Sequence, residues 1–278
     1  MKKKGEVISF ADDTAILYED ETWPNLKSKA EEDISKIKQW LESNKLTINL
    51  KKTKYLPFAS YESGLPQMGP LNINRETSIP EGDAIKYLGI TIERHLKWEK
   101  HIDTLVKKLR CLLPRFRHLK KYLNVEELME IYSSLCQTLI RCGIIGWGGA
   151  YECHMKRVEI IQKWLLRVIY SKPLLFPSDE LYAMSGVMNP HQLYITQILS
   201  AVFSGKIDLQ PIECSYETRN KNCIFTPRAE KRIGQRCFSY LAPRIYREIP
   251  RELRNEKNIG KRKRLIKEWI RHRGSRCF

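Results

Sequence analysis

Short apolar runs separated by polar breaks open the chain. Val7–Phe10 and Thr14–Tyr18 flank one small residue and two adjacent carboxylates, Asp12 and Asp13. Two such runs joined by a short polar stretch predict a β-hairpin that carries the acidic pair at its tip.

The pattern then changes to a helical period. From 23 to 44, apolar residues recur every three or four positions and predict one amphipathic helix. Residues 46–50 alternate apolar and polar side chains, as an edge strand does. Six glycines and prolines within 60–82 predict a loop or short hairpin, and 85–92 resumes the character of a strand.

Beyond residue 97 the helical period dominates. Apolar residues in steps of four and three predict a long helix with one core-facing seam: Trp98, Ile102, Leu105, Leu109, Leu112, Phe116 and Leu119. Pro114 lies inside this pattern and is expected to kink or interrupt the helix. A second helix is predicted from Val125 to Leu139, with Asn124 as its cap. Further helices are predicted at about 155–170, 178–185 and 190–204.

The net charge of the chain narrows the range of possible binding partners. There are 49 Lys and Arg residues against 32 Asp and Glu residues, which gives a net charge of +17. This favours a polyanionic partner, although ribosomal and membrane-surface proteins share such a composition. Met1–Lys4 is basic, but Asp12 and Asp13 interrupt the apolar run behind it, so neither a membrane span nor a secretory signal is predicted and an intracellular location is expected.

Two basic clusters are candidate nucleic-acid-binding surfaces. The first lies on the polar face of the long helix: Lys107, Lys108, Arg110, Arg115, Arg117, Lys120 and Lys121. The second lies near the end of the sequence: Lys261, Arg262, Lys263 and Arg264. Each can bind a phosphate backbone through counterion release, and the second also fits a nuclear-localisation signal. A solvated charged face is the alternative for both.

Other candidate chemistry is weaker. The eight cysteines include no Cys-x-x-Cys pair, so reduced thiols are expected. A zinc site with Cys142, Cys153 and His154 is an alternative whose spacing fits no defined zinc motif. The glycine-rich segment 143–149 lacks the Gly-Lys-Ser/Thr ending of a phosphate-binding loop and is predicted to be a close-packed turn.

Three segments, together with the helical stretch that ends at Trp40-Leu41 between the first two, resemble a known family in sequence and in order. Phe10-Ala11-Asp12-Asp13 resembles the aromatic-x-Asp-Asp box of the reverse transcriptase palm. The segment 44–54 resembles the lysine-bearing palm segment, and Lys86-Tyr87-Leu88-Gly89-Ile90-Thr91-Ile92 resembles the hairpin that grips the primer. The chain is similar to the C-terminal part of reverse transcriptases of non-LTR, LINE-like retrotransposons, of arthropod type. Its segment 233–250 resembles a region near the C-terminus of such polyproteins, with no assigned chemistry.

The resemblance implies a site and its ligands. Asp12 and Asp13 are implied as ligands of two Mg²⁺ ions, Lys52 as an acid for the leaving pyrophosphate, and Tyr87, Leu88 and Gly89 as the primer grip. Lys51 is not excluded in place of Lys52. The implied partners are an RNA template, a DNA primer and deoxynucleotides, and the intact element protein is expected in the nucleus. Each assignment has an alternative. The Asp pair can serve only to form a tight turn, the lysines can lie in a solvated turn, and Gly89 can mark a simple bulge.

A departure from the family qualifies this expectation. The family carries a third metal-binding carboxylate on a strand upstream of the hairpin, and the sequence before Asp12 offers no counterpart. The expected protein is therefore N-terminally truncated and inactive as a polymerase by itself. The alternatives are a nucleic-acid-binding remnant of a decayed element and a basic helical protein without a nucleic-acid role.

The expected fold is α+β. An incomplete palm made of β-hairpins and a helix covers 1–95, thumb-like helices follow at 96–145, a helical C-terminal region covers 146–215, and a basic tail covers 216–278.

Overall fold

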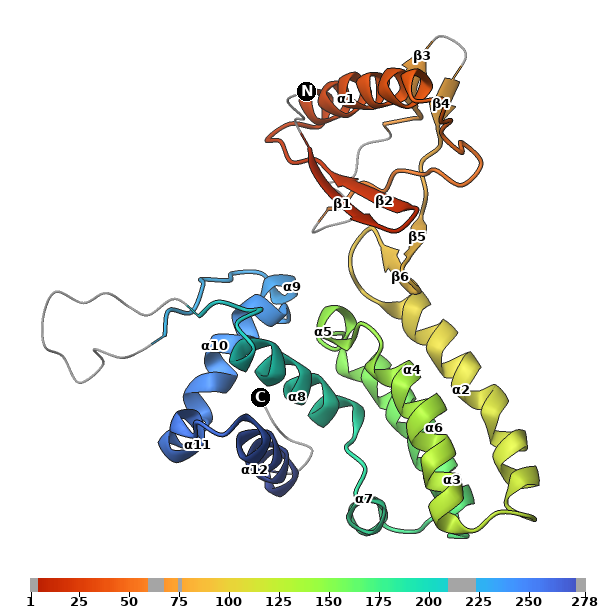
Figure 1. Ribbon diagram of the computed structural model, residues 1–278, viewed down its shortest axis with the longest axis vertical. Helices are drawn as coiled ribbons and strands as arrows, with labels where there is room; N and C mark the ends of the chain where they lie inside the picture. The colour runs from red at the N-terminus through yellow and green to blue at the C-terminus, as the bar shows by residue number, and fades with distance from the viewer. Residues whose placement is uncertain (1–4, 60–67, 75–76, 210–223, 274–278) are drawn as a thin grey trace, which may run out of the picture. The chain divides into compact units, whose positions relative to one another are not determined.

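A computed structural model describes residues 5–59, 68–74, 77–209 and 224–273, and Figure 1 labels its elements. The chain divides into two compact units, with the boundary between Lys97 and Trp98. The first unit combines a helix with antiparallel strands, and the described part of the second is helical. The α+β class is therefore confirmed. Among the described residues, no helix is long and apolar enough to span a bilayer.

The first unit contains antiparallel hairpins and a long helix. Its elements are β1 (Glu6–Phe10), β2 (Asp13–Leu17), α1 (Trp23–Ser43), β3 (Leu71–Asn74), β4 (Thr77–Ile79), β5 (Ala84–Tyr87) and β6 (Ile90–Glu93). The strands pair β1 with β2, β3 with β4, and β5 with β6. The predicted hairpin at the acidic pair, the helix and the strand character of 85–92 are confirmed. The short hairpin predicted within 60–82 is present as β3 and β4, while 60–67 and 75–76 lie outside the described residues.

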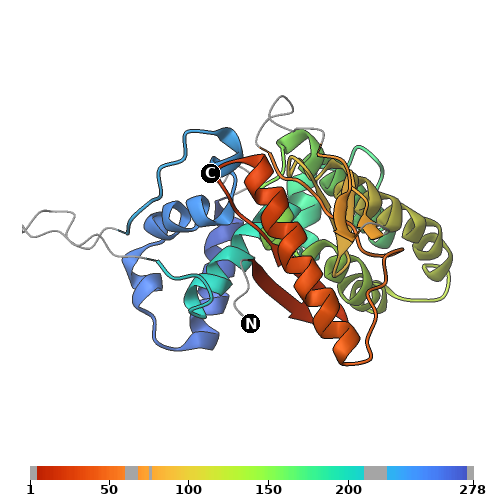
Figure 2. The same ribbon diagram turned by 90° about the horizontal axis from the view of Figure 1, so that it is seen from above.

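A small core joins α1 to the β3–β4 hairpin. Figures 1 and 2 show the helix lying beside these two strands. Leu71, Ile73 and Ile79 alternate with exposed residues and pack with Ala30 of α1. Tyr18, which follows β2, packs against the same cluster. This core therefore connects the acidic hairpin to the helix that follows it.

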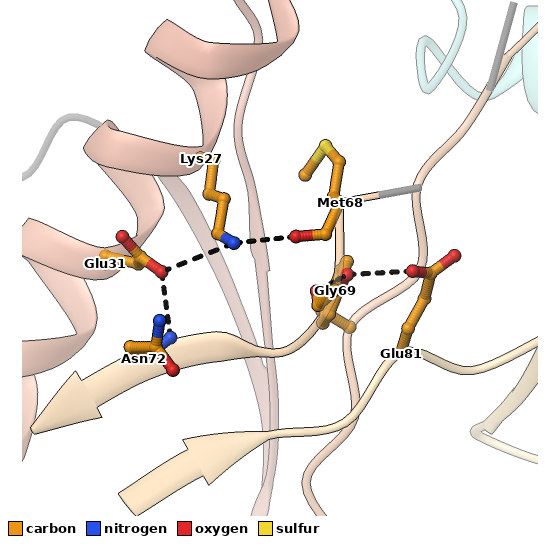
Figure 3. A network of polar contacts seen from close by, with 7 residues as sticks. Lys27, Glu31, Met68, Gly69, Asn72 and Glu81 are labelled. Carbon is orange, nitrogen blue, oxygen red and sulfur yellow. Dashed lines mark hydrogen bonds and ion pairs between the residues drawn. The ribbon is translucent and has the colours of Figure 1, made fainter. Parts of the chain in front are cut away.

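A polar network reinforces this junction (Figure 3). The Lys27 ammonium group donates to the Met68 carbonyl at 2.6 Å, and the Glu31 carboxylate accepts from the backbone amide of Asn72 at 2.8 Å. The Tyr55 hydroxyl lies 3.0 Å from the Glu81 carboxylate. Burial and this carboxylate raise the pKa of Tyr55 above its ordinary value, so the hydroxyl keeps its proton as a donor.

The strand predicted at 46–50 is wrong. These residues form no ladder, and the segment ends in a turn in which the Asn49 carbonyl accepts from the amides of Lys52 and Thr53 at 3.0 and 2.9 Å. Leu46 and Leu50 are exposed. Alternation predicts a strand only where a neighbouring strand supplies hydrogen bonds, and no described strand pairs with this segment.

Helices are the regular elements of the second unit within its described part. Its elements are α2 (Glu99–Leu119), α3 (Val125–Ile131), the π-helical η2 (Tyr132–Gln137), α4 (Thr138–Arg141), α5 (Ile144–Trp147), α6 (Glu152–Ile169), α7 (Ser178–Ser185), α8 (Pro190–Phe203), α9 (Arg232–Gln235), α10 (Phe238–Glu248), α11 (Arg251–Asn255) and α12 (Ile259–His272). The helices predicted from sequence are all present.

The long helix α2 runs beside α6 (Figure 1). The predicted seam is its inner face, where Ile102, Leu109 and Phe116 are fully or almost fully buried. Pro114 does not interrupt the helix, contrary to one form of the prediction. Buried residues on both sides of the proline hold the two halves against the core, and this packing outweighs the backbone hydrogen bond that proline cannot donate.

The predicted helix from Val125 to Leu139 changes its geometry in the middle. Asn124 caps it as expected, and a reciprocal bond with Glu127 completes a capping box. A π-helical stretch, η2, then widens one turn, which the sequence did not predict. Tyr132 and Cys136 within it are both completely buried. The wider turn therefore lets both side chains enter the core.

The C-terminal helices belong to the core of the second unit. α10 and α12 both pack on α8 (Figure 1). Ala242, Ile245, Ile266 and Ile270 are buried in the same cluster as the residues of α2 and α6. The segment 233–250, which has no assigned chemistry, thus forms part of this core.

The segment 143–149 was predicted to be a close-packed turn, but residues 144–147 form the short helix α5. The turn that follows it, at Gly148 and Gly149, packs closely against its neighbours. A Cβ atom on Gly149 would lie 2.1 Å from the Arg236 carbonyl oxygen. Because that oxygen belongs to the backbone, Gly149→Ala is expected to destabilise the unit by about 2–3 kcal/mol. Gly146→Ala is the matched control, since its Cβ would meet only Trp98 at 3.9 Å. Chemical denaturation of both variants measures the difference; equal stability would contradict the close approach.

His101 makes the second unit sensitive to acid. The ring is buried and lies 5.5 Å from the Trp147 ring, centroid to centroid. Burial, with a smaller contribution from Lys108, lowers the pKa of His101 below 6.5. The unfolded chain therefore binds this proton first, and stability is lost as the pH falls through about 6.5. We expect His101→Phe to flatten the dependence of unfolding free energy on pH in this range, and an unchanged slope would contradict this.

Candidate active site and nucleic-acid surface

The acidic pair lies at the tip of the β1–β2 hairpin. Phe10 pairs with Asp13, so Ala11 and Asp12 form a two-residue turn and Asp13 begins β2. Ala11 has a left-handed φ of 51°, a conformation that the Cβ of alanine disfavours. The ladder on both sides holds the backbone there, and the two carboxylates are thus fixed at adjacent positions.

Both carboxylates are available to a ligand. Asp12 and Asp13 are exposed, and no described residue forms an ion pair or a side-chain hydrogen bond with either of them. One face of the same hairpin is apolar and open: Ile8, Phe10 and Leu17 are 42%, 63% and 46% exposed. The site therefore combines two unpaired hard oxygen donors with an adjacent apolar strand surface.

One side-chain hydrogen bond links the β5–β6 hairpin to the acidic hairpin. Leu88 and Gly89 form its turn, both with left-handed backbone, at φ 46° and 84°. Two consecutive positive φ values are typical of the tight turn that matches the twist of a hairpin. The Tyr87 hydroxyl donates to the Ile8 carbonyl of β1 at 3.4 Å. The structure thus brings the Tyr87 side chain to the acidic hairpin, and it places Leu88 and Gly89 in a turn and not in the bulge considered from sequence.

The lysine segment is exposed and lies in the turn at Asn49. Lys51, Lys52 and Lys54 all point to solvent, and neither Lys51 nor Lys52 pairs with the acidic hairpin within the described part of the chain. The choice between Lys51 and Lys52 therefore stays open.

The basic residues of α1 and α2 differ in their partners. On α1, Lys27, Lys29, Lys36 and Lys38 each pair with a carboxylate. On α2 and its end, seven cations are exposed and form no ion pair with any described residue: Lys107, Lys108, Arg110, Arg115, Arg117, Lys120 and Lys121. No aspartate or glutamate occurs between Asp103 and Glu126. Positive charge is thus neutralised on α1 and uncompensated on α2.

Several side chains of the second basic cluster already contact other residues of the chain. Lys261 pairs with Glu256 at 2.9 Å, and Arg264 approaches Glu268 at 3.9 Å. The Arg262 guanidinium lies over the Phe203 ring, 4.4 Å from its centroid. Lys263 is exposed without such a partner among the described residues. The cluster therefore presents less uncompensated charge than α2 does.

No group of three or more potential metal-ligating His, Cys, Asp or Glu residues occurs within the described ranges. Cys142 and Cys153 are free and exposed, and His154 lies against the Tyr151 ring. Cys214, Cys223 and Cys277 lie outside those ranges.

One exposed aromatic residue was missed from the sequence. Tyr122 follows Lys120 and Lys121 in the loop between α2 and α3, and its side chain is 73% exposed. An aromatic residue directly after two lysines, inside a run without acids, was the signal that could have found it.

Comparison with known proteins gives several relatives of one kind. No family model and no solved structure matches. The RNA-directed DNA polymerase from mobile element jockey of Drosophila melanogaster is 28% identical over 170 residues, which cover 60% of this chain and 18% of that protein. The probable RNA-directed DNA polymerases from transposons X-element and BS of the same species are 25% and 22% identical over 169 and 174 residues. The chain spans about a fifth of the length of these relatives. Over three-fifths of its own length, it is a homologue of the RNA-directed DNA polymerases of Drosophila mobile elements.

Proposed function

We propose that this chain forms part of a reverse transcriptase of a non-LTR retrotransposon. The observation that carries the proposal is the pair Asp12 and Asp13, without a partner among the described residues, at the tip of a hairpin to which the Tyr87 hydroxyl donates a hydrogen bond. Residues 1–95 then correspond to part of the palm and 96–145 to the thumb. The relatives named above supply the class of reaction.

The acidic pair suits magnesium. Mg²⁺ prefers one or two carboxylates and completes its shell with water and substrate phosphate, and the two exposed aspartates match this donor set. When bound, two such ions would activate the primer hydroxyl and neutralise charge on the pyrophosphate. In this proposal Asp12 is the main ligand and Asp13 its partner.

The remaining residues position the substrates. The backbone at Leu88 and Gly89 would hold the 3′ end of the DNA primer, because a glycine in an exposed turn leaves room for close approach. Lys52 would pair with phosphate oxygens or protonate the leaving group, with Lys51 as the alternative. The uncompensated cations of α2 would bind the backbone of the template–primer duplex, and Lys261, Arg262, Lys263 and Arg264 would add a second contact or direct the element protein to the nucleus.

A second candidate is a nucleic-acid-binding protein without polymerase activity. It is favoured by α2, whose seven unpaired cations suit a polyanion whether or not the acidic pair is functional. This candidate needs α2 and not Asp12.

Binding and extension assays with an RNA template annealed to a labelled DNA primer test both candidates. Both predict an affinity that falls steeply with salt, because each phosphate contact releases counterions. Extension with Mg²⁺ and deoxynucleotides by the element protein that contains this chain, lost when Asp12 is replaced, supports the polymerase. Tight binding by the chain, with no dependence of extension on Asp12, supports the second candidate. Weak binding that does not respond to salt would contradict both.

A further inference from the structure

We infer that Tyr122 is a stacking platform for an unpaired base of single-stranded RNA, at the end of the basic surface of α2. This inference rests on the proposed function, since it assigns a specific contact to that surface. Tyr122 belongs to no predicted site, and it carries no hydrogen bond from its hydroxyl to any described residue.

The ring is held outward by its neighbours in the chain. Leu119 and Leu123 are half-buried and pack on the main core of the second unit, which leaves Tyr122 on the opposite side of the loop. The Tyr122 amide donates to the Leu119 carbonyl at 2.9 Å, and the Leu123 amide donates to the same oxygen at 3.0 Å. The Asn124 capping box fixes the next residue. The ring is thus presented by an ordered backbone and not by a loose loop.

The Tyr122 ring contributes little to packing within the described part of the chain. With 73% of its surface exposed, Tyr122 is the most exposed aromatic side chain among the described residues. Its one described ring contact is with His118, at 5.4 Å between centroids and a 58° tilt, which covers only part of the ring. Exposed apolar area is unfavourable in water, so a planar partner that covers the free face would stabilise the arrangement.

The residues around Tyr122 indicate what kind of ligand its ring binds. Residues 107, 111, 115, 118 and 122 follow steps of three and four, so Tyr122 continues one exposed row of α2 that includes Lys107, Arg115 and His118. Lys120 and Lys121 precede it directly, and no acid occurs between Asp103 and Glu126. A flat ring beside unpaired cations matches a base attached to a phosphate backbone, and proteins that bind single strands combine these two features.

An unpaired base is required because a base inside a duplex already stacks on both faces. The long single strand that an RNA-directed polymerase handles is its RNA template, so we assign the contact to RNA. Single-stranded DNA presents the same chemistry and therefore serves as one arm of the test.

The test measures the affinity of the full chain for a fluorescein-labelled single-stranded RNA by anisotropy. A second RNA of equal length carries abasic sites, which keep the phosphates and remove the bases. Tyr122→Ala is expected to weaken binding to the intact RNA about tenfold and to leave binding to the abasic RNA unchanged. Tyr122→Trp should restore the affinity. Because the side chain is exposed, circular dichroism should show all variants folded as the parent is.

The matched control removes charge and keeps the ring. The double variant Lys120→Gln, Lys121→Gln should weaken binding to both RNAs and reduce the salt slope by about 0.7 for each phosphate that the variant no longer binds. If this variant weakens binding while Tyr122→Ala changes nothing, or changes both RNAs equally, the stacking inference is overturned and the proposed function stands. A larger effect of Tyr122→Ala on DNA than on RNA overturns the assignment to RNA. Absence of salt-dependent binding by the parent chain overturns both proposals.

Discussion

In the element protein that contains this chain, replacing Asp12 with alanine is expected to lower primer extension along an RNA template at least about a thousandfold, because a metal ligand supplies several kcal/mol of transition-state stabilisation. The carboxylate is exposed and has no partner among the described residues, so its removal should leave folding unchanged. Affinity for Mn²⁺, used as a spectroscopic substitute for Mg²⁺, should fall in parallel. This second readout does not depend on activity.

Glu21→Gln is the control for this variant. Glu21 is also exposed, belongs to the same unit and carries one negative charge, so this variant removes the same formal charge away from the hairpin. It should retain both extension and Mn²⁺ affinity. If both substitutions had the same effect, net charge and not ligation would explain the result, and the assignment of Asp12 as a ligand would fail.

Gln162→Leu is expected to destabilise the second unit by about 3–5 kcal/mol, because it removes the centre of a buried hydrogen-bond network. The Gln162 amide donates to the Tyr132 hydroxyl at 2.9 Å and to the Met188 carbonyl at 3.0 Å, and the Tyr182 hydroxyl donates to Gln162 at 3.0 Å. Burial raises the pKa of Tyr182 above its ordinary value, so its hydroxyl remains a donor. Leucine fills the space and leaves these polar groups without partners.

Gln137→Leu provides the comparison. Gln137 lies in the same unit and is half-buried, and its side chain forms no hydrogen bond with the described residues, so the same change should alter stability by less than about 1 kcal/mol. Urea denaturation followed by tryptophan fluorescence measures both. If Gln162→Leu lowered stability no more than Gln137→Leu does, the hydrogen-bond network would contribute little to the stability of the unit.

Local pattern was sufficient where local chemistry decides the structure. The hairpin at Asp12 and the cap at Asn124 depend on residues within a few positions of one another, and each was predicted. At Gly89 the pattern predicted strand character or a bulge, and the structure has a turn. The seam of α2 was predicted as well, since one amphipathic period defines it. The two aspartates could therefore be found, together with the strands that support them.

Features that depend on distant partners could not be predicted. The bond from Tyr87 to Ile8 joins residues 79 positions apart. The π-helical turn at Tyr132 exists because it lets two side chains enter the core, where Gln162 of another helix meets the tyrosine hydroxyl. The alternation at Leu46 predicted a strand, but no strand in the described part of the chain pairs with it. Pro114 is tolerated because tertiary packing holds α2 on both sides.

The measurement that tests the central claim most directly is metal-directed cleavage of the chain. Fe²⁺ bound in place of Mg²⁺ generates hydroxyl radicals under ascorbate and peroxide, and these cut the backbone beside the metal. The account predicts that the chain is cut within the β1–β2 hairpin and that excess Mg²⁺ suppresses this cleavage. The double variant Asp12→Asn, Asp13→Asn should not be cut there. Cleavage elsewhere in the chain, or cleavage at the hairpin that persists in this variant, would contradict the claim that the aspartate pair binds the metal.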